Sequence, residues 1–120
     1  MSRSLASRFE HLSRASVLGV EVPIVDGYRD RLLGLSKLAR EEAGSGLLIP
    51  RCSSVHTFGM RFRLDLVFLD EEHRPLSARF LVPPRRFAIH PGAYAVLEVP
   101  SLMEGNSIWV LDLGGLDAAA

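Results

Sequence analysis

The chain has 120 residues, 48% of them hydrophobic and 23% charged, a composition that fits one folded domain and excludes an intrinsically disordered protein. Fourteen Lys and Arg balance fourteen Asp and Glu, so no basic field exists that would hold a polyanion. We therefore expect no nucleic acid among the partners of this protein.

The cysteine content and the hydropathy pattern bear on location. Cys52 is the single cysteine and has no partner for an internal disulfide, which makes the cytoplasm the default expectation. The first fourteen residues contain no apolar core of a signal peptide, and no segment approaches the roughly 20 apolar residues of a membrane span. We expect a cytoplasmic protein without a membrane partner.

The two ends of the chain lack a clear hydrophobic period. Residues 1–14 are rich in Ser and Arg, and residues 114–120 read GGLDAAA. Segments of this kind are usually loose in a folded domain. We expect flexible segments at both ends and a single globular domain over residues 15–113.

The first apolar stretch of that domain is SVLGVEVPIV, residues 16–25. Its Val and Ile residues favour extended structure, and Pro23 lacks the amide that a central strand would need. This pattern predicts an edge strand, or two short strands broken at Pro23.

The period changes in the next segment, residues 26–44. Tyr28, Leu32 and Leu35 fall at helical spacing, and glycines at its end supply a stop. The pattern predicts the one early helix of the chain, over about residues 27–40.

Strand and turn signals follow to the end of the domain. The apolar stretches include GLLIPRC, VHTF, LDLVFL, LSARFLV, YAVLEV and SIWVLDL, and DEEHRP reads as a hairpin loop. The predicted fold is a strand-dominated α+β domain, with one helix covering a barrel-like antiparallel sheet of about six strands.

Cys52, His56 and Met60 are spaced four apart and carry ligand types that copper proteins use. On an extended strand, however, a spacing of four separates side chains by roughly 13 Å, too far for one metal ion. We therefore expect no metal and no other cofactor. Arg51 beside Cys52 leaves a reactive thiol open, with a simply buried thiol as the alternative.

Asp65 and Glu98 are acidic residues inside otherwise apolar strands. The residues around Asp65 are apolar in both alternating sets, so this strand is predicted to be covered on both faces. A carboxylate there needs a partner. The guanidinium of Arg61 or Arg63, or backbone N–H groups after Met60, are the predicted donors. Structural pairing is favoured over a binding cleft, which stays open.

A set of motifs now points to a family. HTFGMRF leads into LDLVFLD, RDRLLGL and GLLI precede them, and LVPP and AVLEVP follow. Over roughly residues 17–113 this order resembles the bacterial and archaeal family called domain of unknown function 192. The resemblance implies a small α+β domain with a strongly bent, barrel-like antiparallel sheet and one helix near the start. It implies no known reaction.

Individual positions follow the family pattern. The signature positions are taken by Phe58, Met60, Arg61, Leu64, Asp65 and Asp70, and the later ones by Pro83, Pro84, Leu97 and Glu98. Cys52 and His56 match a subgroup that carries Cys and VHTFGM.

The chain departs from the family pattern in three places. Arg63 stands where proline is common, and SLMEGNS compresses the usual end of the domain. His73 stands where glycine is usual in the hairpin, so we predict that His73 has a positive φ or lies in a loop lengthened to avoid it.

Three functions stay open. The first is a non-enzymatic binding module for a small or peptide ligand, with arginines favouring an anion. Its candidate cleft, facing the PPRR loop, consists of His56, Phe58, Met60, Arg61, Asp65, Pro84 and Glu98. The second is a small hydrolase- or lyase-type enzyme using Asp65 or His56 as proton carrier. The third is a structural interaction domain whose sheet edge receives a peptide strand. We expect an unknown small molecule or protein as partner, and a monomer or weak dimer.

Overall fold

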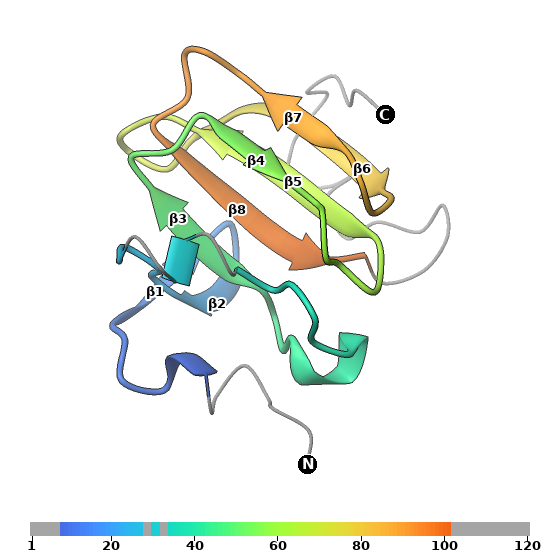
Figure 1. Ribbon diagram of the computed structural model, residues 1–120. Helices are drawn as coiled ribbons and strands as arrows, with labels where there is room; N and C mark the ends of the chain where they lie inside the picture. The colour runs from blue at the N-terminus through green and yellow to red at the C-terminus, as the bar shows by residue number, and fades with distance from the viewer. Residues whose placement is uncertain (1–7, 28–29, 32–33, 102–120) are drawn as a thin grey trace.

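The computed structural model describes residues 8–27, 30–31 and 34–101. Within these residues the chain forms eight strands and one 3-10 turn, η1 (Arg40–Glu42). Figure 1 shows the strands, which are β1 (Arg14–Val17), β2 (Val20–Pro23), β3 (Leu47–Pro50), β4 (Ser54–His56), β5 (Leu64–Leu69), β6 (Pro75–Val82), β7 (Phe87–Ile89) and β8 (Ala95–Pro100).

The strands form three antiparallel sheets. The largest has four strands in the order β3-β8-β5-β6, so β8 and β5 lie in its centre. Strands β1 and β2 form one two-stranded sheet, and β4 and β7 form another. Strand β7 has three residues and was not among the predicted strands.

The two central strands of the four-stranded sheet are buried on both faces. Every residue of β5 and β8 is buried, and alternate residues belong to two different cores. Leu66 and Phe68 pack into the core that includes Ala88 of the β4–β7 sheet. Val67 packs into the core that includes Val17 of the β1–β2 hairpin. The prediction that the LDLVFL strand is covered on both faces is therefore confirmed.

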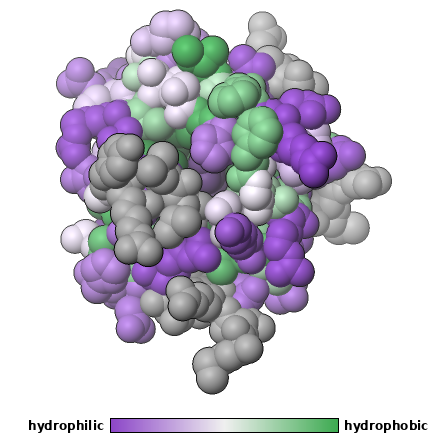
Figure 2. Space-filling view, in the orientation of Figure 1, coloured by the Kyte–Doolittle hydropathy of each residue, from purple (hydrophilic) through white to green (hydrophobic). Residues whose placement is uncertain are grey.

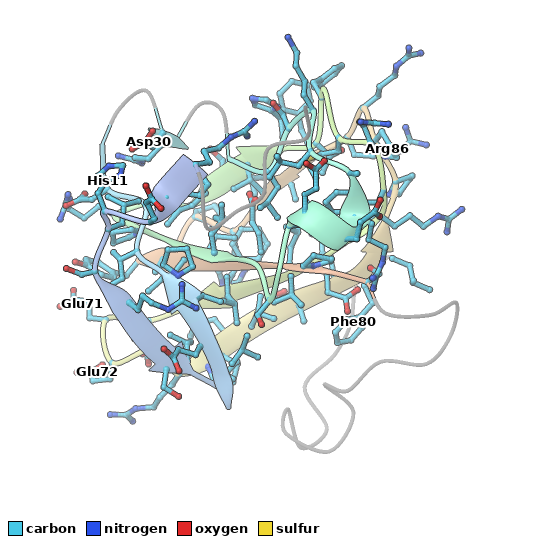
Figure 3. All side chains as sticks on the ribbon, turned by 90° about the horizontal axis from the view of Figure 1, so that it is seen from below. His11, Asp30, Glu71, Glu72, Phe80 and Arg86 are labelled. Carbon is cyan, nitrogen blue, oxygen red and sulfur yellow. The ribbon has the colours of Figure 1, made fainter. Side chains whose placement is uncertain are left out.

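The two covering layers lie on opposite sides of this sheet. Figure 3 shows the β1–β2 hairpin on one side and the chain around Asp30 on the other. The hairpin is attached to the edge strand β3 by a parallel bridge between Ile24 and Leu48, and the N–H of Val25 donates to the carbonyl of Leu48 at 2.8 Å. This link fixes the hairpin beside the edge of the sheet.

Residues 14–23 form two short strands, which was one of the two predicted alternatives. The break between these strands is not at Pro23, however. The chain turns at Leu18 and Gly19, whose φ values are 51° and 81°. Positive φ at both positions is the type I′ geometry that fits a twisted two-residue hairpin. Pro23 instead pairs with Arg14 at the open end of the hairpin.

The continuous helix predicted over residues 27–40 is wrong. Residues 30 and 31 are helical, and the N–H of Gly34 donates to the carbonyl of Asp30. Gly34 and Lys37 then adopt φ values of 47° and 66°, which a right-handed helix excludes. Tyr28 and Leu32, on which the prediction also rested, lie outside the described residues.

The α+β class and the barrel-like sheet also need correction. Among the strands of the described chain, the four-stranded sheet ends at β3 and β6, and no strand pairing joins these two edges into a closed barrel. The element with helical geometry that has defined bounds is the three-residue turn η1. The domain is mostly β, with antiparallel sheets.

The structure describes only part of the two predicted end segments. Phe9 is buried in the core with 2% of its surface exposed, so the packed part of the chain begins before residue 15. Residues 1–7, the predicted strand at 107–113, the SLMEGNS segment after Ser101 and the predicted tail 114–120 lie outside the described residues.

The predicted hairpin loop DEEHRP does connect β5 to β6. His73 has a φ of 62°, which confirms the predicted positive φ. The Asp70 side chain accepts hydrogen bonds at 2.9 Å from the N–H groups of Glu72 and Arg74. These bonds hold the loop in the conformation that a glycine would otherwise favour.

Candidate functional site

A cavity of about 250 Å³ opens between β4 and the segment of residues 34–36. Strand β3 and the loop after β4 contribute further walls, and β8 provides the floor. The apolar lining includes Leu35, Ile49, Val55, Phe58 and Met60, and the ionisable lining residues are Arg31, His56 and Glu98. We call this cavity the Glu98 pocket.

Glu98 reaches this cavity because of its register in the central sheet. It pairs with Leu47 on one side and Leu66 on the other, so its side chain lies on the same face as theirs. Glu98 is 5% exposed, and no described residue forms a hydrogen bond or an ion pair with its carboxyl group. A Cβ atom added to Gly34 would lie 3.6 Å from Glu98 Oε1. The backbone of Gly34 therefore lies beside this acid.

Burial changes the acidity of Glu98. Desolvation raises the pKa of this carboxyl group from 4.5 to about 7, because burial disfavours its charged form. The ionised and the neutral form are therefore both available near neutral pH. A carboxyl group with this property inside a pocket is typical of ligand-binding and proton-transfer sites.

Aromatic side chains form one rim of the pocket. The ring centroid of Phe58 lies 5.8 Å from that of His56 and 5.2 Å from that of Phe87. Phe58, Phe87 and Ile89 are large apolar side chains that are 44%, 77% and 58% exposed. Figure 2 shows green, hydrophobic side chains gathered over this part of the surface, around β4 and β7.

Thr57 ties the rim to the PPRR loop. Its hydroxyl donates to the carbonyl of Pro83 at 2.7 Å and accepts from the N–H of Arg86 at 2.9 Å. The N–H of Thr57 donates to the carbonyl of Arg86 as well. The side chain is 1% exposed. The loop after β4 is therefore fixed by a buried threonine that the sequence analysis did not single out.

Asp65 lies on the other face of the sheet. It pairs with Val99, one residue from Glu98, and successive residues of a strand point to opposite faces. Asp65 Oδ1 accepts from the N–H of Leu81 at 3.0 Å and from the hydroxyl of Ser101 at 2.7 Å. Neither donor was predicted.

The Leu81 contact explains why an acid is needed there. The register between β5 and β6 shifts between Leu64 and Leu66, where β6 carries one extra residue. Leu81, in this bulge, has a φ of 55° and an N–H that points away from a regular ladder. Asp65 is 4% exposed and supplies the missing acceptor. Its structural contacts agree with the favoured prediction of pairing.

The structure brings together only part of the predicted cleft. His56, Phe58, Met60 and Glu98 line the pocket. Arg61, Asp65 and Pro84 are not among its lining residues, and register puts Asp65 on the opposite face. Arg31, Leu35 and Ser36 line the pocket but were missed. Arg31 and Leu35 belong to the RDRLLGL motif, and Ser36 follows it directly. This motif was a signal, but the segment was interpreted as a helix.

Cys52 lies apart from this site. Its thiol donates to the carbonyl of Ser54 at 3.0 Å, and its side chain packs against the edge of the core. It does not line the Glu98 pocket. In the described part of the chain, no three His, Cys, Asp or Glu side chains are grouped as metal ligands would be.

Fold and site together define a small, mostly β domain with a pocket above a buried acid. The chain belongs to the family DUF192, "Uncharacterized ACR", whose model matches residues 11–106. This match confirms the resemblance carried by the HTFGM and LDLVFLD motifs.

A solved structure supports the fold. The crystal structure of a protein of unknown function from Novosphingobium aromaticivorans DSM 12444 has a TM-score of 0.54 and 17% sequence identity to this chain. The match covers 84% of this chain and 89% of the other. No curated protein matches the chain. Helices within the described residues are all too short or too polar to cross a membrane.

Proposed function

We propose that this protein is a non-enzymatic binding module and that the Glu98 pocket holds a small ligand. The observation that carries this proposal is the carboxyl group of Glu98, which is 5% exposed, lines a cavity and has no bonding partner among the described residues. Buried polar groups are normally satisfied. A ligand that donates a hydrogen bond to Glu98 would satisfy this one.

The size and lining of the pocket support the same function. An apolar cavity of roughly 150 Å³ is enough to bind benzene, and this cavity measures about 250 Å³. Leu35, Ile49, Val55 and Met60 offer apolar walls. Pockets for small ligands commonly combine such walls with a few polar groups that fix orientation. A ring with a short polar substituent matches the space and the chemistry.

The contacts of the two residues considered for catalysis favour binding over reaction. Asp65 accepts two structural hydrogen bonds on the opposite face of the sheet. His56 lines the pocket, but its Nδ1 accepts the N–H of Phe58 at 3.2 Å, which leaves Nε2 for a ligand. A polar contact from His56 at the rim fits a binding role for this ring.

A fragment screen followed by NMR tests the proposal. Small ring compounds should perturb amide resonances of residues 34–36 and 54–60, which form the walls. Phe58→Ala should weaken binding of a hit by roughly five- to tenfold, since loss of about 1 kcal/mol of apolar contact is expected. Ile89→Ala is the matched control. Ile89 is exposed on the same two-stranded sheet but does not line the pocket. Perturbations elsewhere, or equal effects of the two variants, would contradict the proposal.

A further inference from the structure

We propose that the ligand of the Glu98 pocket is a small organic cation, an ammonium group on a compact hydrocarbon body, with the ammonium paired to Glu98. This inference rests on the proposed binding function and names its ligand class. The sequence pattern favoured an anion through the arginines of the predicted cleft, but Arg61 does not line the pocket.

The first argument is the missing counter-charge. A carboxylate in an apolar site is costly unless a cation or several donors accompany it. No described residue forms a hydrogen bond or an ion pair with Glu98, and Leu47 and Leu66 flank it within the sheet. A neutral ligand would remove the remaining water without supplying charge. An ammonium group supplies both a charge and N–H donors.

The second argument is the chemistry of the walls, which disfavours an inorganic cation. A hard metal ion takes six or more oxygen ligands or keeps its water, whereas Leu35, Ile49 and Met60 offer none. The same walls suit hydrocarbon. Phe58 at the rim presents a ring to which a cation is attracted. The pocket therefore suits a cation that carries its own apolar surface.

Two other ionisable residues face the pocket, Arg31 and His56. The Arg31 guanidinium donates to the backbone carbonyl of Arg51 at 3.0 Å, which directs part of it toward that loop. His56 stands at the rim, where its Nδ1 is occupied. The Arg31 guanidinium would repel a second positive charge. The expected ligand has one cationic group, placed at Glu98, and a neutral or anionic opposite end.

This pairing makes a distinct prediction for pH. A cation binds the ionised form of Glu98, so binding lowers the pKa of this group and releases a proton. Because the pKa in the empty pocket is about 7, affinity should increase at least about tenfold from pH 5.5 to pH 8.

The test uses benzylamine, benzyl alcohol and benzoate as probes of equal ring size and different charge. Binding to the full chain is followed by NMR titration at about pH 5.5 and pH 8, and the amine stays protonated at both. Benzylamine should bind at least tenfold more tightly than benzyl alcohol at the higher pH. Calorimetry in buffers of different ionisation enthalpy should show proton release.

Three variants separate the contributions. Glu98→Gln should abolish the preference for benzylamine and most of its pH dependence. Glu71→Gln, an exposed acid in the β5–β6 loop, should change neither. His56→Gln should keep the pH dependence if Glu98 is the group that titrates. Should Glu98→Gln fail to fold, proton release by the unaltered chain decides the question.

The outcomes distinguish the two proposals. Equal binding of benzylamine and benzyl alcohol at the pocket would overturn the cation and leave the binding module standing. Tighter binding of benzoate would also overturn the cation, in favour of an anion held near Arg31. If none of the probes perturbs residues 34–36 or 54–60 at millimolar concentration, the pocket is not a site for such ligands and both proposals fall.

Discussion

Asp65 and Glu98 are two buried carboxyl groups on neighbouring central strands, but their surroundings differ. Asp65 accepts hydrogen bonds from Leu81 and Ser101, and its carboxyl group is part of the framework of the sheet. Glu98 faces a cavity, and burial raises its pKa. The presence of fixed donors, more than the degree of burial, therefore separates a structural acid from a candidate binding acid.

The structural role of Asp65 predicts the effect of its removal. Asp65→Ala leaves the N–H of Leu81 and the hydroxyl of Ser101 without their acceptor in a buried place. The variant should lose about 2–4 kcal/mol of unfolding free energy, measured by chemical denaturation. Glu71→Ala, in the exposed loop, should lose less than roughly 0.5 kcal/mol. Equal denaturation midpoints for the two variants would contradict this assignment.

For single residues, the sequence predicted those features that depend on nearby residues of the chain. The positive φ of His73 followed from a short hairpin loop and was confirmed. The donors to Asp65 lie 16 and 36 residues away along the chain. They are set by a bulge in β6 and by the end of β8, which no local pattern reveals. Arg61 and Arg63 were named instead because they are close in sequence.

Among the elements, the segment before β3 lies very close to the backbone of β8 at Gly46. Gly46 has a φ of 111°, and a Cβ atom there would lie 2.0 Å from the backbone carbonyl oxygen of Glu98. No side chain fits in that space. Gly46 therefore sets how closely the chain entering β3 approaches the strand that carries the candidate binding acid.

Alanine at two glycines separates crowding from backbone strain. Gly46→Ala should destabilise the fold by at least about 3 kcal/mol, because strain at positive φ and overpacking combine. Gly19 also has a positive φ, of 81°, but nothing lies within 4 Å of its added Cβ. Gly19→Ala should therefore cost only about 1–2 kcal/mol. Thermal and chemical denaturation of both variants measures the difference, and equal losses would show that the crowding is relieved by a small shift.

The predicted helix failed at the scale of the element for a physical reason. Leu35 is buried, so the apolar spacing did identify a residue that faces the core. Turns as well as helices place residues three apart on one side, however. The positive φ values of Gly34 and Lys37, and the hydrogen bond from the N–H of Lys37 to the carbonyl of Gly59, depend on tertiary contacts that the pattern does not contain.

For the whole molecule, the sequence predicted the strand-rich class and the central strand buried on both faces. It predicted only part of the pocket lining, namely His56, Phe58, Met60 and Glu98. Its walls come from four separated parts of the chain, and the placement of Glu98 depends on the pairing of β8 with β3 and β5. A shift of one residue in that register would turn Glu98 to the opposite face. Spacing within one strand cannot fix such a relation.

Glu98 should also make the stability of the whole fold depend on pH. Its pKa is 4.5 as a free group and about 7 in the fold, so the folded state holds the proton more tightly. The stabilising effect is full below about pH 4.5 and is lost as pH rises through about 7. It amounts to roughly 3 kcal/mol at most.

Denaturation of the unaltered chain and Glu98→Gln at about pH 5 and pH 8 tests this dependence. The difference in unfolding free energy between the two proteins should shift in favour of the glutamine variant as pH rises. Glu72→Gln, in the exposed hairpin loop, serves as the control and should follow the unaltered chain. A constant difference across this range would mean that Glu98 is hydrated in the fold.

The pocket is built from two different sheets, and these sheets should differ in how readily they open locally. β8 is hydrogen-bonded to strands on both sides. Among the described strands, β4 pairs with β7 alone, and it has exposed side chains on its outer face. Amide hydrogens of β8 should exchange with solvent only when the whole molecule unfolds, and those of β4 through smaller local openings. Hydrogen-exchange NMR should therefore show faster exchange in β4. The floor of the pocket would then stay in place while one wall opens, giving a ligand an entry route that leaves the central sheet intact.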